Sequence, residues 1–185
     1  GPLNCAVDAL TLDTLNASSG PDLQYCWSTN EGLILGDSLG TSISIGAAGT
    51  YYLTVKNTFT FCTGLDSIMI QIDTLSPSAE AGVGFELNCS VLQDTLSAAG
   101  SSRGANISYQ WNGPCILSGE STTTAVVDCP GTYYLEVSNT DNACVAVDSV
   151  LVTQDENIPV ADVGVGYVLT CDSLTITIDA GNSSQ

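Results

Sequence analysis

Five of the eight cysteines in this 185-residue chain recur at equivalent places, and the chemistry open to them is disulfide formation. Cys5, Cys89 and Cys171 each follow a Leu-Asn or Leu-Thr pair, whereas Cys62 and Cys144 each stand four residues before an Asp-Ser-apolar triplet. The chain has no histidine and the spacings do not fit a zinc site, so the cysteines predict an oxidising compartment. Their recurrence favours one bridge inside each repeat, Cys5–Cys62 and Cys89–Cys144.

This pairing has an alternative, because the end loops of one module meet those of its neighbour. Cys5 would then pair with Cys144 across a junction. Cys115 and Cys129 occur only in the second repeat and flank its fourth strand region, which predicts a local bridge between them. Cys171 is expected to find its partner beyond residue 185.

Cys26 is left over from these pairs and lies between Tyr25 and Trp27. Neighbouring residues of a strand point to opposite faces, so Cys26 points outward if Trp27 points inward. A spare thiol on the outer face of a secreted protein favours pairing with another molecule. The alternative is a rearranged pairing inside the first repeat.

Acidic side chains dominate the charge, since 20 carboxylates stand against Lys56 and Arg103 and give a net charge of −18. We therefore expect no nucleic-acid partner. We also expect no membrane insertion, because no stretch approaches the roughly 20 apolar residues of a membrane span. Asp155, Glu156 and Asp162 form a weak calcium candidate, with a solvated acidic linker as the alternative.

Catalysis is not expected of this sequence. It has no histidine, no basic residue near a candidate nucleophile and no glycine loop of the kind that cradles phosphate. Paired carboxylates alone carry little weight in a chain built of regular repeats. We therefore interpret the chain as a protein that is not an enzyme and needs no cofactor, calcium being the one candidate.

An internal repeat with a period of 82 to 84 residues positions all of these side chains. Tyr25-Cys26-Trp27 recurs as Tyr109-Gln110-Trp111, and residues 49–58 recur as 131–140. Self-similarity at a fixed period indicates an array of like modules. Short proline-bearing junctions divide the array into residues 1–76, residues 77–158 and the beginning of a third repeat at 159–185.

Neither end of the array matches a whole module. The first repeat lacks the Ala-x-x-Gly-Val-Gly segment that leads into the other two, and residues 160–185 supply only the first strands of the third. Two explanations are open. The chain is a window cut from a longer array, or its tail completes the deficient first module of a neighbouring copy.

The second repeat shows the expected elements best. Short runs with period-2 alternation, separated by Gly, Ser, Asn and Pro, predict an all-β antiparallel sandwich. A tryptophan in the third strand and a tyrosine that opens the penultimate strand fit an immunoglobulin-like order. The predicted strands are 85–89, 94–98, 107–111, 122–127, 131–139 and 145–152, with Tyr133, Leu135 and Val137 on the inner face.

Several motifs of the chain resemble PKD-like or Ig-like repeats, which are strung along large surface and secreted proteins of Bacteroidota. That resemblance implies stalks, adhesins or filaments, often exported by a type IX system. The motifs are Ala161-Asp162, Gly164, Leu169-Thr170-Cys171 and Ile178-Asp179-Ala180-Gly181, and in the later half of a repeat Pro130-Gly131-Thr132-Tyr133, Asn139-Thr140-Asp141-Asn142-Ala143-Cys144 and Asp148-Ser149-Val150.

Seven of the 14 aspartates begin an Asp-Ser/Thr-Leu/Ile/Val triplet, which is similar to the O-glycosylation sequon of the same bacterial group. The alternative is local hydrogen bonding between the aspartate and nearby backbone. We expect O-glycans on Thr14, Ser38, Ser67, Thr74, Thr95, Ser149 and Ser173.

Together these features predict a structural or adhesive extracellular protein of a bacterial surface or biofilm, with tandem modules that self-associate into a filament or fibre. The alternatives are an adhesin module that binds carbohydrate or protein, and a passive spacer. Tyr52, Tyr134 and Phe59 are candidates for sugar stacking or lateral contacts.

Overall fold

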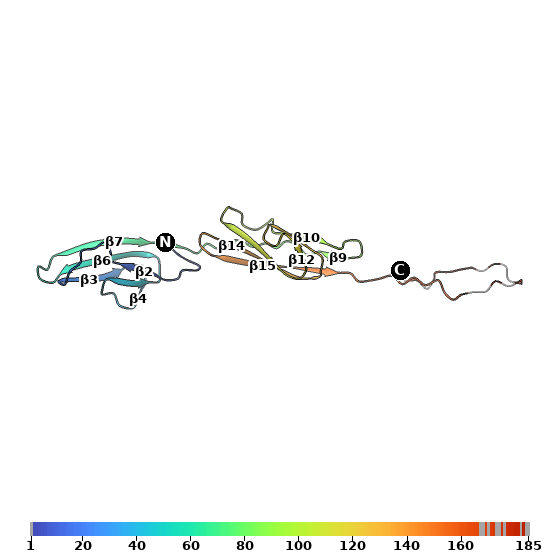
Figure 1. Ribbon diagram of the computed structural model, residues 1–185, viewed down its shortest axis with the longest axis horizontal. Coiled ribbons are helices and arrows are strands. Elements are labelled where there is room, and N and C mark those ends of the chain that lie inside the picture. Colours follow the sequence, from blue (N-terminus) through green and yellow to red (C-terminus); the bar gives the residue numbers. More distant parts are fainter. Residues whose placement is uncertain are drawn as a thin grey trace.

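The computed structural model describes residues 2–166, 169, 171, 172, 175, 177–181 and 183. Their strands form two β-sandwich modules that lie end to end, and the residues after the last strand leave the second module at the end far from the first (Figure 1). None of the described residues forms a helix long and apolar enough to span a bilayer.

The strands of the two modules follow the same order, except that the single last strand of the second module is divided into two in the first. Those of the first module are β1 (Leu3–Asn4), β2 (Leu10–Asp13), β3 (Leu23–Thr29), β4 (Ile34–Leu35), β5 (Ser42–Ile45), β6 (Gly49–Asn57), β7 (Thr63–Ile70) and β8 (Ile72–Asp73). Those of the second are β9 (Glu86–Leu87), β10 (Asp94–Ser97), β11 (Ile107–Asn112), β12 (Ile116–Ser118), β13 (Thr124–Val127), β14 (Gly131–Asn139) and β15 (Val145–Gln154).

Two facing sheets build each sandwich. In the first module one sheet has the order β2-β5-β4 and the other β3-β6-β7, while β1 pairs in parallel with β8. In the second module the sheets are β10-β13-β12 and β11-β14-β15-β9, and β9 pairs in parallel with β15. This arrangement is the immunoglobulin-like sandwich that the strand pattern predicts.

Strict alternation places the core of the second module. Tyr133, Leu135 and Val137 on β14 are fully buried, and Tyr134 between them is exposed. They pack with Trp111 between the two sheets, as the period-2 pattern predicts. The first module has the smaller buried core, around Trp27 and Tyr51.

The tyrosine that recurs in each core has a satisfied hydroxyl group. The Tyr51 hydroxyl donates to the Ala47 carbonyl at 2.7 Å, and the Tyr133 hydroxyl donates to the Cys129 carbonyl at 2.7 Å, which confirms the predicted tyrosine corner. Burial raises the pKa of Tyr133, the negative charge of Asp128 raises it further, and the hydrogen bond to Cys129 opposes both.

Sequence reasoning missed the short strands β4 and β12. Each has only two or three residues, too few to show a period, and β12 pairs with β13 through a shift of register. The strands expected within 159–185 fall partly on residues outside the described set, among them Leu174 and Ile176. The described residues of that stretch lie in no strand.

Candidate functional site: the junction and the groove beside it

The structure joins the two modules through a disulfide between Cys5 and Cys144, whose Cα atoms are 5.0 Å apart. The predicted pairs inside each repeat are therefore wrong, and the pairing across the junction is the one that forms. Cys62 and Cys89, the expected partners, are both free and exposed. The reason is positional: the loop before the last strand lies at the opposite end of its own module from the first turn, next to the preceding module.

Two structured loops present the bridged cysteines. Cys5 lies in the first turn, residues 4–7, where the Asn4 side-chain oxygen accepts hydrogen bonds from the Ala6 and Val7 amides at 3.0 and 2.8 Å. Cys144 ends the β14–β15 loop, residues 140–144, in which Ala143 has a positive φ of 56°. A fixed backbone on both sides holds the two sulfur atoms within bonding distance.

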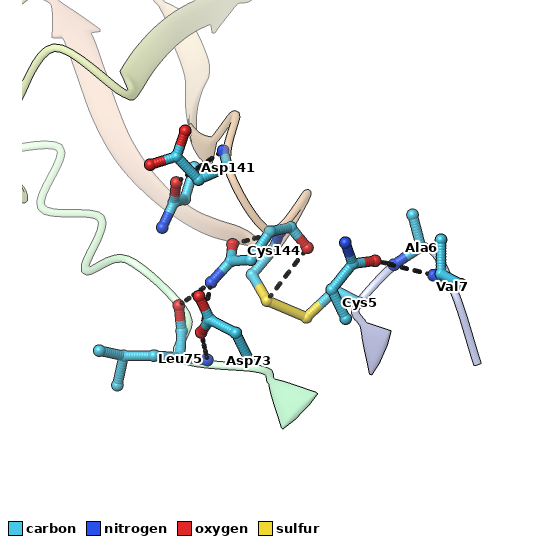
Figure 2. The surroundings of a disulfide bond; sticks show 10 residues. Cys5, Ala6, Val7, Asp73, Leu75, Asp141 and Cys144 are labelled. Carbon is cyan, nitrogen blue, oxygen red and sulfur yellow. Dashed lines mark hydrogen bonds between the residues drawn. A yellow bond between two sulfur atoms is a disulfide. The ribbon is translucent and has the colours of Figure 1, made fainter. Parts of the chain in front are cut away.

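Asn142 is the polar contact of this junction. Figure 2 shows the Cys5–Cys144 bridge with Asp73 and Leu75 of the first module beside it. The Asn142 side chain is 1% exposed, and its amide nitrogen donates to the Asp73 carboxylate at 2.9 Å and to the Leu75 carbonyl at 3.0 Å. Its backbone carbonyl accepts from the Cys5 amide at 3.1 Å. One buried residue of the second module thus contacts the first turn, the last strand and the linker of the first.

Cys115 and Cys129 form the expected local bridge, at a sequence separation of 14. This bridge ties Cys115, which directly precedes β12, to Cys129, which lies two residues after the end of β13. Cys26 is exposed on β3 next to buried Trp27, as its position predicts, and Cys171 is also exposed and free. Whether Cys26 pairs with another molecule stays a prediction.

The first module carries an open groove of about 580 Å³ along β2, the β2–β3 connection and β7. In the second module the same place holds residues 78–82, which we call the leading segment. There the Ala81 amide donates to the Asp148 carboxylate at 2.7 Å, and Ala81 is 1% exposed. The equivalent carboxylate of the first module, Asp66, is exposed on the groove.

Burial differs between the modules where the leading segment lies. Val150 is 5% exposed beneath it, whereas the equivalent Ile68 of the first module is 46% exposed. Leu135 is fully buried and its equivalent Leu53 only partly. The groove is therefore an uncovered edge of the first core. The sequence shows that the first repeat lacks this segment, but no pattern in it predicts the groove.

The predicted glycosylation sites occupy varied surroundings. Ser67, Thr74, Thr95 and Ser149 are exposed, Thr14 and Ser38 are half-buried, and Ser173 lies outside the described residues. Five of the aspartates in these triplets accept a hydrogen bond from the backbone one or two residues later, which is the local bonding considered as the alternative.

The calcium candidates Asp155, Glu156 and Asp162 are not brought together within the described part of the chain. The one group of three possible ligands found there is Cys115, Asp128 and Cys129. Its two sulfur atoms are already joined to each other in the local disulfide. We therefore assign no metal to this cluster.

No protein-family model matches this chain, and no curated protein is similar to it in sequence. Among solved structures, three N-terminal domains of the outer capsid protein Hoc of bacteriophage RB49 align with 17% identity, covering 83% of this chain and 55% of that one, at a TM-score of 0.43. The first eight Ig domains of Down syndrome cell adhesion molecule align with 13% identity, covering 80% of this chain and 23% of that one, at a TM-score of 0.38. Drosophila OTK extracellular domains 3–5 align with 12% identity, covering 88% of this chain and 66% of that one, at a TM-score of 0.29.

This chain spans about half the length of the solved three-domain phage fragment and about a quarter of the solved eight-domain fragment of the adhesion molecule. Identities and TM-scores so low say nothing of its partners or role. The fold itself rests on the strands: a tandem array of immunoglobulin-like sandwiches, joined by a disulfide and by the buried side chain of Asn142.

Proposed function

We propose that this chain is a tension-bearing segment of an extracellular structural or adhesive array. The observation that carries the proposal is the Cys5–Cys144 bridge, which connects the first turn of one module to the last loop of the next. A disulfide fits an oxidising, extracellular location. A strongly acidic surface keeps such an array soluble and apart from nucleic acid.

The bridge changes the covalent route that tension follows. Force applied at the two ends enters at Cys5, crosses the disulfide and leaves at Cys144, so that the 139 residues of sequence separation are bypassed. Only β1 on one side and β15 on the other lie outside the closed loop. Most of both sandwiches is thereby shielded from extension, which suits a fibre more than a pocket-bearing module.

Single-molecule stretching of the whole chain from its ends tests the proposal. The oxidised chain should release only β1, β15 and the tail. The variant carrying Cys5→Ser and Cys144→Ser should lengthen by roughly 400–450 Å more on unfolding. This is about 3.3–3.6 Å per residue over the sequence separation of 139, less the 14 that the Cys115–Cys129 bridge still bypasses. Cys115→Ser with Cys129→Ser is the matched control and should keep the short extension. An oxidised chain that lengthens by hundreds of ångströms would refute the proposal.

The bacterial and glycan parts of the proposal rest on sequence resemblance. We propose that the array belongs to the PKD-like and Ig-like repeat proteins of Bacteroidota surfaces, with O-glycans on the exposed triplets. Ser67 and Ser149 are the best-placed sites, since both are exposed at equivalent positions of β7 and β15. Peptide mass spectrometry of material from the native host checks this: unmodified Ser67 and Ser149 peptides would remove the glycan proposal and leave the tension-bearing role intact.

An adhesin module is the second candidate function. It is favoured by exposed aromatic side chains, since Phe59 is 83% exposed and Tyr134 is 51% exposed. Such rings stack on sugars or on partner side chains. Binding of a glycan set that is lost in Tyr134→Ala but kept in Phe59→Ala would support stacking on the outer face of β14.

A further inference from the structure

We propose that Cys89 of one copy and Cys62 of the next form the same bridge that Cys5 and Cys144 form inside the chain, giving a covalent head-to-tail assembly of copies. The inference goes beyond the proposed function and gives a partner to two cysteines, Cys62 and Cys89, that are free in the single chain. Cys89 occupies the position of Cys5 in the repeat, and Cys62 occupies that of Cys144.

The turn that holds Cys89 reproduces the turn that holds Cys5. The Asn88 side-chain oxygen accepts from the Ser90 and Val91 amides at 2.9 and 3.0 Å, as Asn4 does in the first module. The backbone beside it is also the same, because the Asp155 carboxylate accepts from the Asn157 amide at 2.9 Å, as Asp73 accepts from Leu75 at 3.2 Å. The second module thus ends in the surface that the first uses at the internal junction.

The loop that holds Cys62 likewise reproduces the loop that holds Cys144. Asn57 donates its amide to the Cys62 carbonyl at 2.9 Å, and Asn139 does so to Cys144 at 2.9 Å. The residue before each cysteine has a positive φ, 59° at Phe61 and 56° at Ala143. Thr60 stands in place of Asn142, and its hydroxyl is a donor that can meet Asp155 of another copy.

Apolar side chains lie on both unused surfaces. Phe59 and Phe61 lie just before Cys62 and are 83% and 70% exposed. The equivalent residues of the loop that holds Cys144 are Asp141 and Ala143. Leu92, just past the turn that holds Cys89, is 71% exposed. An association of the two surfaces would cover all three side chains. A second copy of this chain carries both surfaces and is the partner that we infer.

The tail and the groove support the same register. Val163 of the tail is equivalent to Ala81, and Gly164 has a φ of 76° where Gly82 has 78°. Residues 161–164 of one copy would therefore lie in the groove of the next as the leading segment does in the second module, with Asp66 accepting from the backbone as Asp148 does. One pair of contacts is exchanged. Asp162 bonds Ser183 of its own copy at 2.9 and 3.1 Å, as Glu80 bonds Ser101, and Ala17 of the groove offers no hydroxyl in place of Ser183.

The chemistry is ordinary thiol oxidation by a small-molecule disulfide. The Cys62 and Cys89 thiols lose two protons and two electrons as their S–S bond forms, and the S–S bond of oxidised glutathione breaks to give two reduced molecules. The contact joins different surfaces and is heterologous, and because the two modules lie end to end it favours an open filament over a closed ring. Since each copy carries a charge of −18, physiological salt should favour the association over low salt.

Two variants mixed together test the inference. The oxidised 185-residue chain in glutathione buffer should give a ladder of covalent multimers on non-reducing electrophoresis. Cys62→Ser alone and Cys89→Ser alone should each stay monomeric, and their mixture should give a single dimer linked Cys62–Cys89 by peptide mapping. Cys26→Ser and Cys171→Ser are matched controls and should leave the ladder unchanged. Links spread over all four thiols, Cys62–Cys62 links, or no multimers would overturn the inference.

The groove contact has its own matched pair of variants. Val163→Asp places a charge at the position that Ala81 buries, and should slow ladder formation about tenfold or more. Val165→Asp changes the position equivalent to Val83, which is 92% exposed, and should have little effect. Equal rates for both variants would remove the tail from the assembly. Stretching a single copy tests only the Cys5–Cys144 bridge. Failure of the multimer experiment would therefore leave the proposed function intact, and failure of the stretching experiment would leave this inference intact.

Discussion

At the scale of the residue, the junction depends on a side chain that both donates and accepts. Asn142 donates to Asp73 and Leu75 and accepts from the Cys144 amide at 3.0 Å. No charged residue can do the same there, because an ionised carboxylate has no donor to offer Asp73, and a lysine or arginine side chain has no acceptor for the Cys144 amide. Every buried side-chain nitrogen or oxygen among the described residues has a hydrogen-bond partner. A substitution that removes the Asn142 donor would therefore break a satisfied set, leaving Asp73 and Leu75 without these bonds.

Asn142→Asp should therefore loosen the junction without changing side-chain size. It sets one carboxylate against another in a buried place, at an expected cost of about 2–3 kcal/mol. Hydrogen exchange of the Cys5 amide, which donates to the Asn142 carbonyl, should become faster by the corresponding factor. Thr60→Asp is the matched control at the equivalent exposed position of the first module. Unchanged Cys5 exchange in Asn142→Asp would show that the disulfide alone fixes the junction.

At the scale of the element, the leading segment completes a sandwich that is otherwise open along one edge. Its chief polar contact is the Ala81 amide on Asp148, and its apolar contact is Ala81 over Leu135 and Val150. The same aspartate in the first module, Asp66, lies on an open groove. The two modules thus provide an internal comparison of the segment's contribution.

Asp148→Asn should destabilise the second module by about 1–3 kcal/mol, because it weakens a hydrogen bond made to a charged acceptor. Asp66→Asn should leave the first module within experimental error, since no leading segment donates to it in a single copy. Urea unfolding of both variants, followed by Trp111 and Trp27 fluorescence respectively, measures the difference. Equal losses would mean that Asp148 acts through its own strand and not through the segment.

The elements were predictable where their residues alternate in sequence. The β14 pattern places Tyr133, Leu135 and Val137 in the core, and the structure buries all three. The partners of Cys5 and Cys144 were not, because this pairing depends on which loop ends meet in space, and the repeat alone fits both Cys5–Cys62 and Cys5–Cys144. The bridge between Cys115 and Cys129 was predictable because both are local to one repeat. The groove escaped sequence analysis for a related reason: it is defined by a segment that the first module does not contain.

At the scale of the whole molecule, two bridges of different span perform different tasks. Cys115–Cys129 closes 14 residues inside one module, whereas Cys5–Cys144 closes 139 across two. On the chain-entropy account the short loop contributes about 3 kcal/mol and the long one about 5 kcal/mol to stability. Only the long one also limits how the modules turn about the linker.

Removing each bridge separately should reveal this division by small-angle X-ray scattering. Cys5→Ser with Cys144→Ser leaves the junction to Asn142 and the linker, so the two modules should bend and the mean radius of gyration should fall relative to the oxidised chain. Cys115→Ser with Cys129→Ser should lower the melting temperature of the second module and leave the scattering curve unchanged. Because the few hydrogen bonds of Asn142 are worth far less than a covalent bond, we expect the first variant to behave as two linked bodies. A scattering curve unaltered by loss of Cys5–Cys144 would place the stiffness of the rod in the Asn142 contacts instead.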